Sequence, residues 1–244
     1  MKTLVIIPSR LSAQRLPGKP LIKIKGLSII SHVFKKAEEA NIGEVIVAAE
    51  DQEIVDDVKQ NGGQAILTKN EHKTGTDRIY EVFQKINSSD IDLIMNLQGD
   101  EPLMNVEDIR NLNKKMIESS SKLGTLASKI HDKNLLENSN VVKVLTKENL
   151  NQTNFPEAEN FMRNISQEKE NIYHHLGIYS YNKDTLEKFV SLNQSTNEIK
   201  NRLEQLRALD NDIKINVAFA NFSPIGVDTV EDLEAVKKIM ENKS

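Results

Sequence analysis

The chain has 244 residues, enough for one sizeable core or for a core with a smaller lobe. Its formal net charge of −4 argues against a nucleic-acid-binding protein, which usually carries a strong excess of basic residues. The absence of cysteine excludes disulfides, thiolate metal sites and a cysteine nucleophile. No apolar run approaches the length of a membrane span and no signal-peptide pattern is present, so we expect a cytoplasmic protein without a membrane partner.

The first loop follows a short apolar run at residues 4–7, which predicts a buried strand. Three cations come next, Arg10, Arg15 and Lys19, among prolines that stiffen the loop. Open α/β sheets bind ligands at the carboxyl ends of their strands, and guanidinium and ammonium groups there suit a polyphosphate. The alternative is a solvated basic loop, which would have no need of stiffening prolines beside its charges.

The rest of the first half alternates strand and helix patterns. Strands are predicted at residues 45–49, 65–67 and 93–97, and helices are predicted to start near Ser28, Asp51 and Thr76, with Gly43 as the stop of the first. This β-α-β-α order predicts an α/β fold with a mostly parallel sheet and helices on both faces.

The second half is less regular. We predict strands at 126–130, 141–145, 175–181 and 213–220, and helices from Asn105, at 185–192, at 198–209 and from Thr229. The polar stretch 146–169 is interpreted as loop with a short helix or strand. Together these patterns predict one compact domain over residues 1–244 with an inserted mixed or antiparallel portion.

Two aspartates stand where parallel strands end. Asp100 follows a buried strand and can hold Mg²⁺, a cation that prefers oxygen ligands, or can simply terminate the strand in a turn. Asp228 precedes the last helix and can act with Asp100 or serve as an ordinary acid at a helix start. The residues alone leave both alternatives open.

Several motifs resemble one family, the cytidylyltransferases that activate 3-deoxy-manno-octulosonate (Kdo). They are Ile7-Pro8-Ser9-Arg10 with Arg15-Leu16-Pro17-Gly18-Lys19-Pro20-Leu21, Thr74-Gly75-Thr76-Asp77-Arg78, Gln98-Gly99-Asp100-Glu101-Pro102, His175-Leu176-Gly177-Ile178-Tyr179 and Gly226-Val227-Asp228-Thr229. The match runs from Leu4 to about Val236 with the motifs in order. It implies a Rossmann-like, GT-A-like nucleotidyltransferase sheet with an irregular acceptor and dimerisation portion at about 103–210.

The resemblance also implies roles for individual residues. Asp100 and Asp228 become ligands of Mg²⁺, and Arg10, Arg15 and Lys19 become catalytic cations that carry the phosphates. Nucleotide binding is implied for Pro8, Ser9, Arg10, Arg15, Lys19, Thr74, Gly75, Asp77 and Arg78. Sugar binding is implied for Gln98, Arg163, His175, Tyr179, Glu204 and Gln205.

The expected reaction is transfer of CMP from CTP to a 3-deoxy-octulosonic acid with release of pyrophosphate, for lipopolysaccharide biosynthesis, by a homodimer. The chain departs from the family pattern at Ala48-Ala49-Glu50, at Phe161-Met162-Arg163 and at Ser195-Thr196-Asn197-Glu198. The resemblance places the last two near the acceptor pocket, which leaves Kdo and its 8-amino analogue both open as substrates. The alternatives are a CMP-sialic acid synthetase-like enzyme, a nucleotidyltransferase for sugar 1-phosphates, and a non-catalytic nucleotide-binding homologue.

Overall fold

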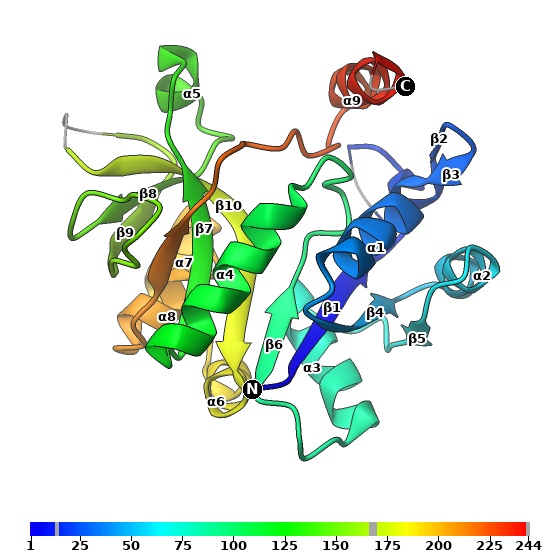
Figure 1. The fold of residues 1–244 in the computed structure, drawn as a ribbon, viewed down its shortest axis with the longest axis horizontal. Helices are drawn as coiled ribbons and strands as arrows, with labels where there is room; N and C mark the ends of the chain where they lie inside the picture. The colour runs from blue at the N-terminus through cyan, green and yellow to red at the C-terminus, as the bar shows by residue number, and fades with distance from the viewer. Residues whose placement is uncertain (13–14, 166–169, 243–244) are drawn as a thin grey trace. The chain divides into compact units, whose positions relative to one another are not determined.

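The structure, a computed structural model, describes residues 1–12, 15–165 and 170–242. It divides into two compact units: the central unit, Asp108–Ser223, and the terminal unit, Lys2–Glu107 with Pro224–Ser244 (Figure 1). Throughout the part of the chain that is described, no helix combines the length and hydrophobicity of a bilayer crossing.

The terminal unit is built on four parallel strands. These are β1 (Thr3–Ser9), β4 (Gly43–Ala49), β5 (Ala65–Leu67) and β6 (Leu93–Asn96), in the spatial order β6-β1-β4-β5. Val5 of β1 pairs with Val45 on one side and with Met95 on the other. All three side chains are buried, as is usual for parallel strands covered on both faces. The predicted parallel sheet is therefore confirmed.

Helices cover both faces of these strands. They are α1 (Ile29–Ala40), α2 (Gln52–Gln60), α3 (Gly75–Ile86) and α9 (Val230–Asn242), with the short elements η1 (Lys19–Leu21), β2 (Lys23–Ile24) and β3 (Leu27–Ser28). Figure 1 shows α1 in front of β1 and α3 behind it. Ser28 caps α1 as predicted, accepting from the Ser31 N–H at 3.2 Å. The helix ends at Asn41 in the left-handed conformation, and Gly43, which we expected to be its stop, already belongs to β4.

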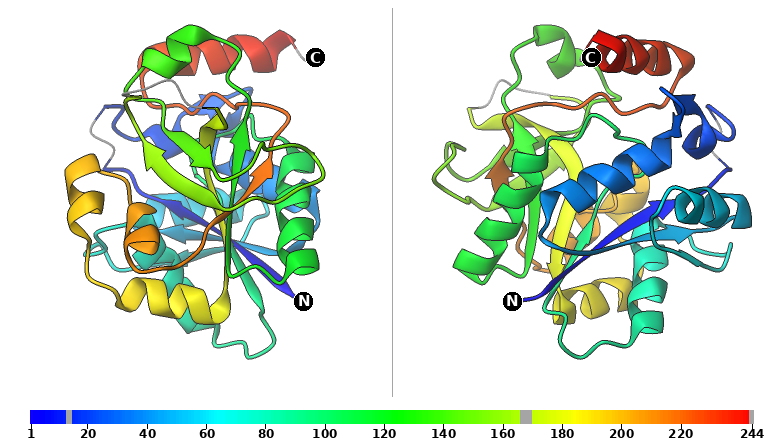
Figure 2. Two further views of the ribbon diagram at one scale, coloured as in Figure 1. Left: turned by 90° about the vertical axis from the view of Figure 1, so that its left-hand side faces the viewer. Right: turned by 45° about the vertical axis from the view of Figure 1, so that its right-hand side comes forward.

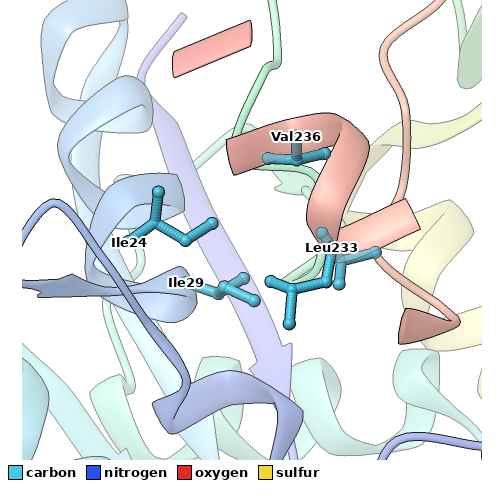
Figure 3. Close-up of a cluster of buried hydrophobic side chains, with 5 residues drawn as sticks. Ile24, Ile29, Leu233 and Val236 are labelled. Atoms are coloured by element: carbon cyan, nitrogen blue, oxygen red, sulfur yellow. The ribbon is translucent and has the colours of Figure 1, made fainter. Parts of the chain in front are cut away.

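A small apolar cluster fastens the end of the chain to the terminal unit (Figure 3). Its buried members are Ile24, Ile29, Val227, Leu233 and Val236. Burying such side chains stabilises by about 1.5–3 kcal/mol each. The cluster thus fixes α9 and the segment that leads into it.

The central unit contains the mixed portion of the fold. Its elements are α4 (Val106–Ser119, starting two residues before the unit), β7 (Leu123–Ser128), α5 (Lys133–Glu137), β8 (Lys143–Thr146), β9 (Ala158–Met162), β10 (Ile172–Asn182), α6 (Lys183–Ser191), α7 (Thr196–Asn201), α8 (Leu206–Asp210) and β11 (Asn216–Phe219). β10 is antiparallel to β7 and β8, β9 is antiparallel to β8, and β11 is parallel to β7. α4 lies alongside β7, where Met116 and Leu112 pack so closely that Gly124 has no room for a side chain (Figure 2). The predicted mixed or antiparallel portion is confirmed.

One prediction for the central unit was wrong, and one short helix was missed. The helix expected at 198–209 is two helices, α7 and α8, because Arg202 adopts the left-handed conformation at φ 54° and ends the first. The short helix α5 was not predicted. The strand β9 lies within the stretch 146–169, of which residues 166–169 are outside the described residues.

Candidate active site

The loop after β1 is shaped by its own backbone. Gly18 adopts a positive φ of 69° and its N–H donates to the Leu11 carbonyl at 3.2 Å. The Leu11 N–H donates to Asp51 Oδ2 at 2.8 Å, so Asp51 holds this loop instead of capping α2 with its side chain. These bonds fix the turn that places Lys19 at the start of η1.

Lys19 joins the two aspartates singled out from the sequence. Its Nζ lies 2.6 Å from Asp100 Oδ2 and 3.1 Å from Asp228 Oδ1. The Lys19 side chain is only 11% exposed, yet its pKa is raised: burial opposes the charge, but the two carboxylates outweigh burial. Arg15 adds a second cation, with Nη2 2.8 Å from Asp228 Oδ2.

Backbone contacts tie the two aspartate segments together. The Val227 N–H donates to the Asp100 carbonyl at 2.9 Å. Asp232 Oδ2 accepts from the N–H groups of Asp228 and Thr229, and Thr229 Oγ1 accepts from the Asp232 N–H, so a reciprocal cap is present at the start of this helix. Asp228 is therefore held by the start of α9.

A third carboxyl group lies beside this pair. Glu101 Oε2 is buried and accepts no hydrogen bond from the described residues. Burial, followed by the charges of Asp100 and Asp228, raises the pKa of Glu101 to about 8, although Lys19 opposes the shift. The carboxyl group is thus largely protonated at neutral pH.

The oxygen atoms here fit Mg²⁺. Asp100 and Asp228 place carboxylate oxygens around one ammonium, and Mg²⁺ is usually held by one or two carboxylates together with substrate phosphates and water. No group of three or more acidic, His or Cys ligands occurs among the described residues, so a metal here would need oxygens from the substrate.

A cavity of about 780 Å³ opens over these residues, within the size range of small-molecule sites. It is lined by Pro8, Ser9, Arg10, Ser12, Arg15, Leu16, Lys19, Pro20, His72, Lys73, Thr74, Gly75, Arg78, Gln98, Gly99, Asp100 and Asp228. All of them belong to the terminal unit. The structure thus brings the predicted phosphate loop, both aspartates, Gln98 and the Thr74 segment to one cavity.

The start of α3 forms another part of the cavity wall. Thr74 caps α3 and makes a capping box with Asp77, whose carboxylate accepts from the Thr74 N–H at 3.2 Å. Asp77, expected to bind nucleotide, is therefore engaged in the cap and does not occur among the described residues that line the cavity. Gly75 lies against Pro8, since a Cβ there would stand 3.4 Å from Pro8 Cγ.

Arg78 lines the cavity but directs its guanidinium to protein groups. It donates to Thr68 Oγ1 at 2.6 Å and to the Lys69 carbonyl at 3.1 Å, and it pairs with Glu50. Only 3% of the residue is exposed. Glu50 stands where the family resemblance leads us to expect aspartate, and here it serves to hold Arg78.

Cavity residues that the sequence interpretation missed include His72 and Lys73. They lie in the connection between β5 and α3, immediately before Thr74. Their position at the carboxyl end of a predicted parallel strand was the signal that could have found them.

The remaining candidates belong to the central unit. His175 Nε2 lies 3.0 Å from Thr125 Oγ1, and its ring packs edge-on against Phe161 and beside Tyr179. Burial, with a smaller effect of His174, lowers the pKa of His175 to about 3, so the imidazole is neutral at pH 7. Burial is also the main reason why the pKa of Tyr179 lies well above its ordinary value.

Arg163, Glu204 and Gln205 complete this set. Arg163 donates to the backbone carbonyls of Asn201, Ser139 and Arg202, each at 3.2 Å. A guanidinium has about five N–H donors, so about two are not engaged by the described residues. Glu204 Oε1 lies 3.9 Å from the buried Arg207, and Gln205 is buried at the start of α8.

Comparison with known proteins agrees with this geometry. A sequence model described as cytidylyltransferase matches residues 4–215. A 3-deoxy-manno-octulosonate cytidylyltransferase of Rhodopseudomonas palustris is 38% identical over 98% of each chain, and one of Thermodesulfovibrio yellowstonii is 40% identical over all of each. A solved structure of CMP:2-keto-3-deoxy-manno-octonic acid synthetase, complexed with CTP, covers all of this chain at 34% identity with a TM-score of 0.90. A 4-diphosphocytidyl-2C-methyl-D-erythritol synthase from Anaerococcus prevotii, at 14% identity and a TM-score of 0.66, shares the fold.

A parallel sheet with a cation-rich cavity at the carboxyl ends of its strands, together with these matches, defines a nucleotidyltransferase of the cytidylyltransferase class. Within that class, the chain belongs to the 3-deoxy-manno-octulosonate cytidylyltransferase family.

Proposed function

We propose that the protein transfers CMP from CTP to the anomeric hydroxyl of a 3-deoxy-octulosonic acid, either Kdo or its 8-amino analogue, with release of pyrophosphate. The product would serve lipopolysaccharide biosynthesis. One observation carries the proposal: Lys19 Nζ contacts both Asp100 and Asp228 inside a cavity that Arg10 and Arg15 also line. The names of the relatives support the choice of CTP and of this sugar class.

The cations of the first loop would bind the triphosphate. Arg10 and Arg15 can pair with phosphate oxygens through two N–H groups at once, and Lys19 adds a compact charge. Arg15 and Lys19 now contact Asp228, so they are already positioned next to the carboxylates. Their charge would stabilise the departing pyrophosphate, and Pro8, Ser9, Thr74, Gly75, Asp77 and Arg78 would form or support the nucleotide pocket.

Asp100 and Asp228 would hold Mg²⁺, which when bound supplies neutralisation of charge on the α-phosphate. With those carboxylates engaged, Lys19 can donate to phosphate oxygens. The sugar hydroxyl would form a bond to the α-phosphorus and release its proton to solvent water, while the bond from that phosphorus to the pyrophosphate oxygen breaks and pyrophosphate leaves. Positioning and electrostatic stabilisation carry such a step, so no covalent enzyme intermediate is needed.

Gln98, Arg163, His175, Tyr179, Glu204 and Gln205 are proposed to bind the sugar acid. Gln98 lies at the end of β6 and lines the cavity. The two guanidinium N–H donors that Arg163 has left suit a sugar carboxylate. A homodimer and a cytoplasmic location belong to the same proposal, on the strength of the family resemblance and of CTP as substrate.

The test is pyrophosphate release from CTP with Mg²⁺, run side by side with Kdo, 8-amino-Kdo and N-acetylneuraminic acid. Release with Kdo or its amino analogue is the expected result, and the ratio of their rates identifies the sugar. Release with N-acetylneuraminic acid alone, or CTP binding with no release from any of the three, would contradict the proposal.

A further inference from the structure

Thr125 is a fully buried polar residue to which the proposed chemistry gives no role. It lies in β7, and its side chain points away from α4, because successive side chains of a strand alternate and Gly124 faces that helix. Its Oγ1 lies 2.7 Å from the Ile178 carbonyl oxygen, 3.2 Å from that of Leu176 and 3.0 Å from His175 Nε2. All three partners belong to β10, the neighbour of β7 in the sheet (Figure 1). One hydroxyl group thus serves three groups of the adjacent strand.

A bulge in β10 produces this arrangement. Leu176 is paired with Leu126 of β7, whereas Tyr179 is already paired with Thr125, so β10 has additional residues between the two pairs. Such bulges re-aim side chains and are frequent beside active sites. Here the bulge directs two carbonyl groups to the Thr125 hydroxyl and brings the rings of His175 and Tyr179 to a centroid distance of 5.5 Å. A hydroxyl, an imidazole and a phenol therefore meet on one face of the sheet.

The single proton of the Thr125 hydroxyl decides which nitrogen of His175 carries a proton. A threonine hydroxyl donates one hydrogen bond and otherwise accepts, and a carbonyl oxygen only accepts. The 2.7 Å contact with the Ile178 carbonyl therefore uses the hydroxyl proton. Thr125 Oγ1 must then accept from His175, so the imidazole proton lies on Nε2. Because burial lowers the pKa of His175 to about 3, the ring is neutral at pH 7 and Nδ1 has a lone pair.

The acceptor at His175 Nδ1 is available to a ligand. Nδ1 has no hydrogen bond with the described residues, and it is not one of their polar atoms that are sealed from solvent without a partner. Aromatic side chains cover the rest of the ring, with Phe161 edge-on at a centroid distance of 5.0 Å. Burial raises the pKa of Tyr179, so its hydroxyl stays protonated and can donate. An acceptor and a donor thus lie side by side, which suits a hydroxyl group of a ligand.

We propose that Thr125 is a positioning residue, which keeps His175 Nδ1 free to accept a hydrogen bond from a hydroxyl group of the sugar acid. That hydroxyl would donate to Nδ1 and accept from Tyr179. Without the Thr125 oxygen, a proton on Nε2 would lose its buried acceptor, whereas a proton on Nδ1 could still be bound by solvent. The proton would therefore move to Nδ1, which could no longer accept. The inference rests on the proposed function, because it takes His175 as a contact of the sugar.

The experiment compares the full chain with its Thr125→Val variant, which lacks the hydroxyl, in pyrophosphate release from CTP with Kdo and with 8-amino-Kdo. The KM for the accepted sugar should rise about tenfold, as for the loss of one hydrogen bond with its group left unpaired. The dissociation constant of CTP should stay unchanged. Thr125→Ser keeps the hydroxyl and should keep the KM of the parent protein. Thr146→Val is the matched control, because Thr146 is 1% exposed and donates to the Glu148 carbonyl at 2.6 Å instead of contacting His175.

Two readouts separate this role from a merely structural one. Long-range ¹⁵N–¹H spectra should show the His175 proton on Nε2 in the parent protein and in Thr125→Ser, and on Nδ1 in Thr125→Val. His175→Phe should raise the KM for the sugar at least as much as Thr125→Val does. The double variant should raise it no further than His175→Phe alone, because Thr125 acts only through His175.

The position of the His175 proton tests the inference without reference to activity. A proton on Nδ1, or on both nitrogens, in the parent protein at pH 7.5 would overturn the inference and leave the proposed function intact. An unchanged KM for the sugar in Thr125→Val, or an equal weakening of sugar and CTP, would do the same. A parent protein that releases no pyrophosphate with Kdo or with 8-amino-Kdo would overturn the proposed function and the role of Thr125 together.

Discussion

Lys19 Nζ lies 3.1 Å from Asp228 Oδ1 although the two residues are 209 positions apart in the chain. The contact joins the first loop of the terminal unit to the segment that re-enters this unit after the central unit. Asp100 meets the same ammonium from a third segment. Three separate stretches must therefore be in place before the carboxylate pair exists.

Replacing Asp100 tests the carboxylate pair directly. Asp100→Ala should lower pyrophosphate release by about 10³-fold or more, because in the proposed mechanism the Mg²⁺ that would neutralise the α-phosphate loses one of its two carboxylate ligands. The far-UV circular dichroism and thermal midpoint should stay near those of the parent protein. Asp56→Ala, on the exposed side of α2, is the matched control and should keep full activity. Normal turnover in Asp100→Ala would remove Asp100 from the mechanism.

Replacing Lys19 tests the proposed binding of the triphosphate by the cations of the first loop. Lys19→Met should weaken CTP binding by roughly 10- to 100-fold, as expected for the loss of a charged hydrogen bond, and should also lower turnover. Isothermal titration with CTP measures the first effect and pyrophosphate release the second. Lys23→Met, which removes an exposed lysine of β2, should change neither quantity. Equal CTP affinity in the parent protein and Lys19→Met would contradict the assignment.

Breaking a buried ion pair should destabilise the central unit. Arg207 donates to both oxygens of Glu198, at 2.8 and 2.6 Å, and the two side chains are 3% and 4% exposed. Arg207→Met leaves a buried carboxylate unpaired and should lower the free energy of unfolding by about 3–5 kcal/mol in urea titrations. The double variant Glu198→Leu with Arg207→Met should lose less free energy of unfolding than Arg207→Met alone, because it leaves no buried charge unpaired. Lys237→Met, at a surface pair, should stay within about 0.5 kcal/mol of the parent protein.

His175 should make folding stability depend on pH. Its pKa is about 3 in the folded chain, against about 6.5 for an unperturbed histidine. Below pH about 6.5 the unfolded chain binds a proton that the folded chain rejects, so stability falls as the pH drops toward 3. At pH 5 the loss attributable to His175 is about 2 kcal/mol.

Urea unfolding at pH 7.5 and pH 5 of the parent protein, His175→Gln and His131→Gln checks this dependence. In the parent protein the free energy of unfolding should differ between pH 7.5 and pH 5, and in His175→Gln this difference should be smaller by about 2 kcal/mol, whatever the stability of the variant at pH 7.5. His131 is exposed, so His131→Gln should keep the whole difference. Equal pH dependence in all three proteins would show that His175 titrates normally.

The fold was largely predictable because its signals are local. An apolar run such as residues 4–7 predicts the strand that contains it, and a capping residue such as Ser28 predicts the helix that follows directly. The prediction of one helix over 198–209 failed because Leu203 and Leu206 have helical spacing. The break lies at Arg202, which adopts the left-handed conformation, and such a position is usually marked in a sequence by glycine, which is not present here. Its geometry accompanies the buried contact between Glu198 and Arg207, which periodicity does not reveal.

The candidate site was predictable in its charged residues and less so in their partners. Arg10, Arg15 and Lys19 belong to the loop after β1, Asp100 follows β6 and Asp228 precedes α9, and the structure places all of them around one cavity. In contrast, nothing in the sequence shows that Arg78 is held by Glu50 or that Arg163 is bound to three backbone carbonyls. The pairing of His72 with Glu81 depends on a loop folding back along α3, and a loop conformation leaves no periodic signal.

The apolar cluster of Figure 3 has a consequence for how the protein is made. Val227, Leu233 and Val236 follow the central unit in the chain, whereas Ile24 and Ile29 precede it, so the cluster can form only after the central unit has been made. On the ribosome, β1, β4, β5 and β6 can assemble early, but Asp228 reaches Lys19 only after the whole central unit has been translated. An interrupted chain would therefore carry most of the cavity lining without Asp228, and under the proposed function it would stay inactive until α9 had packed.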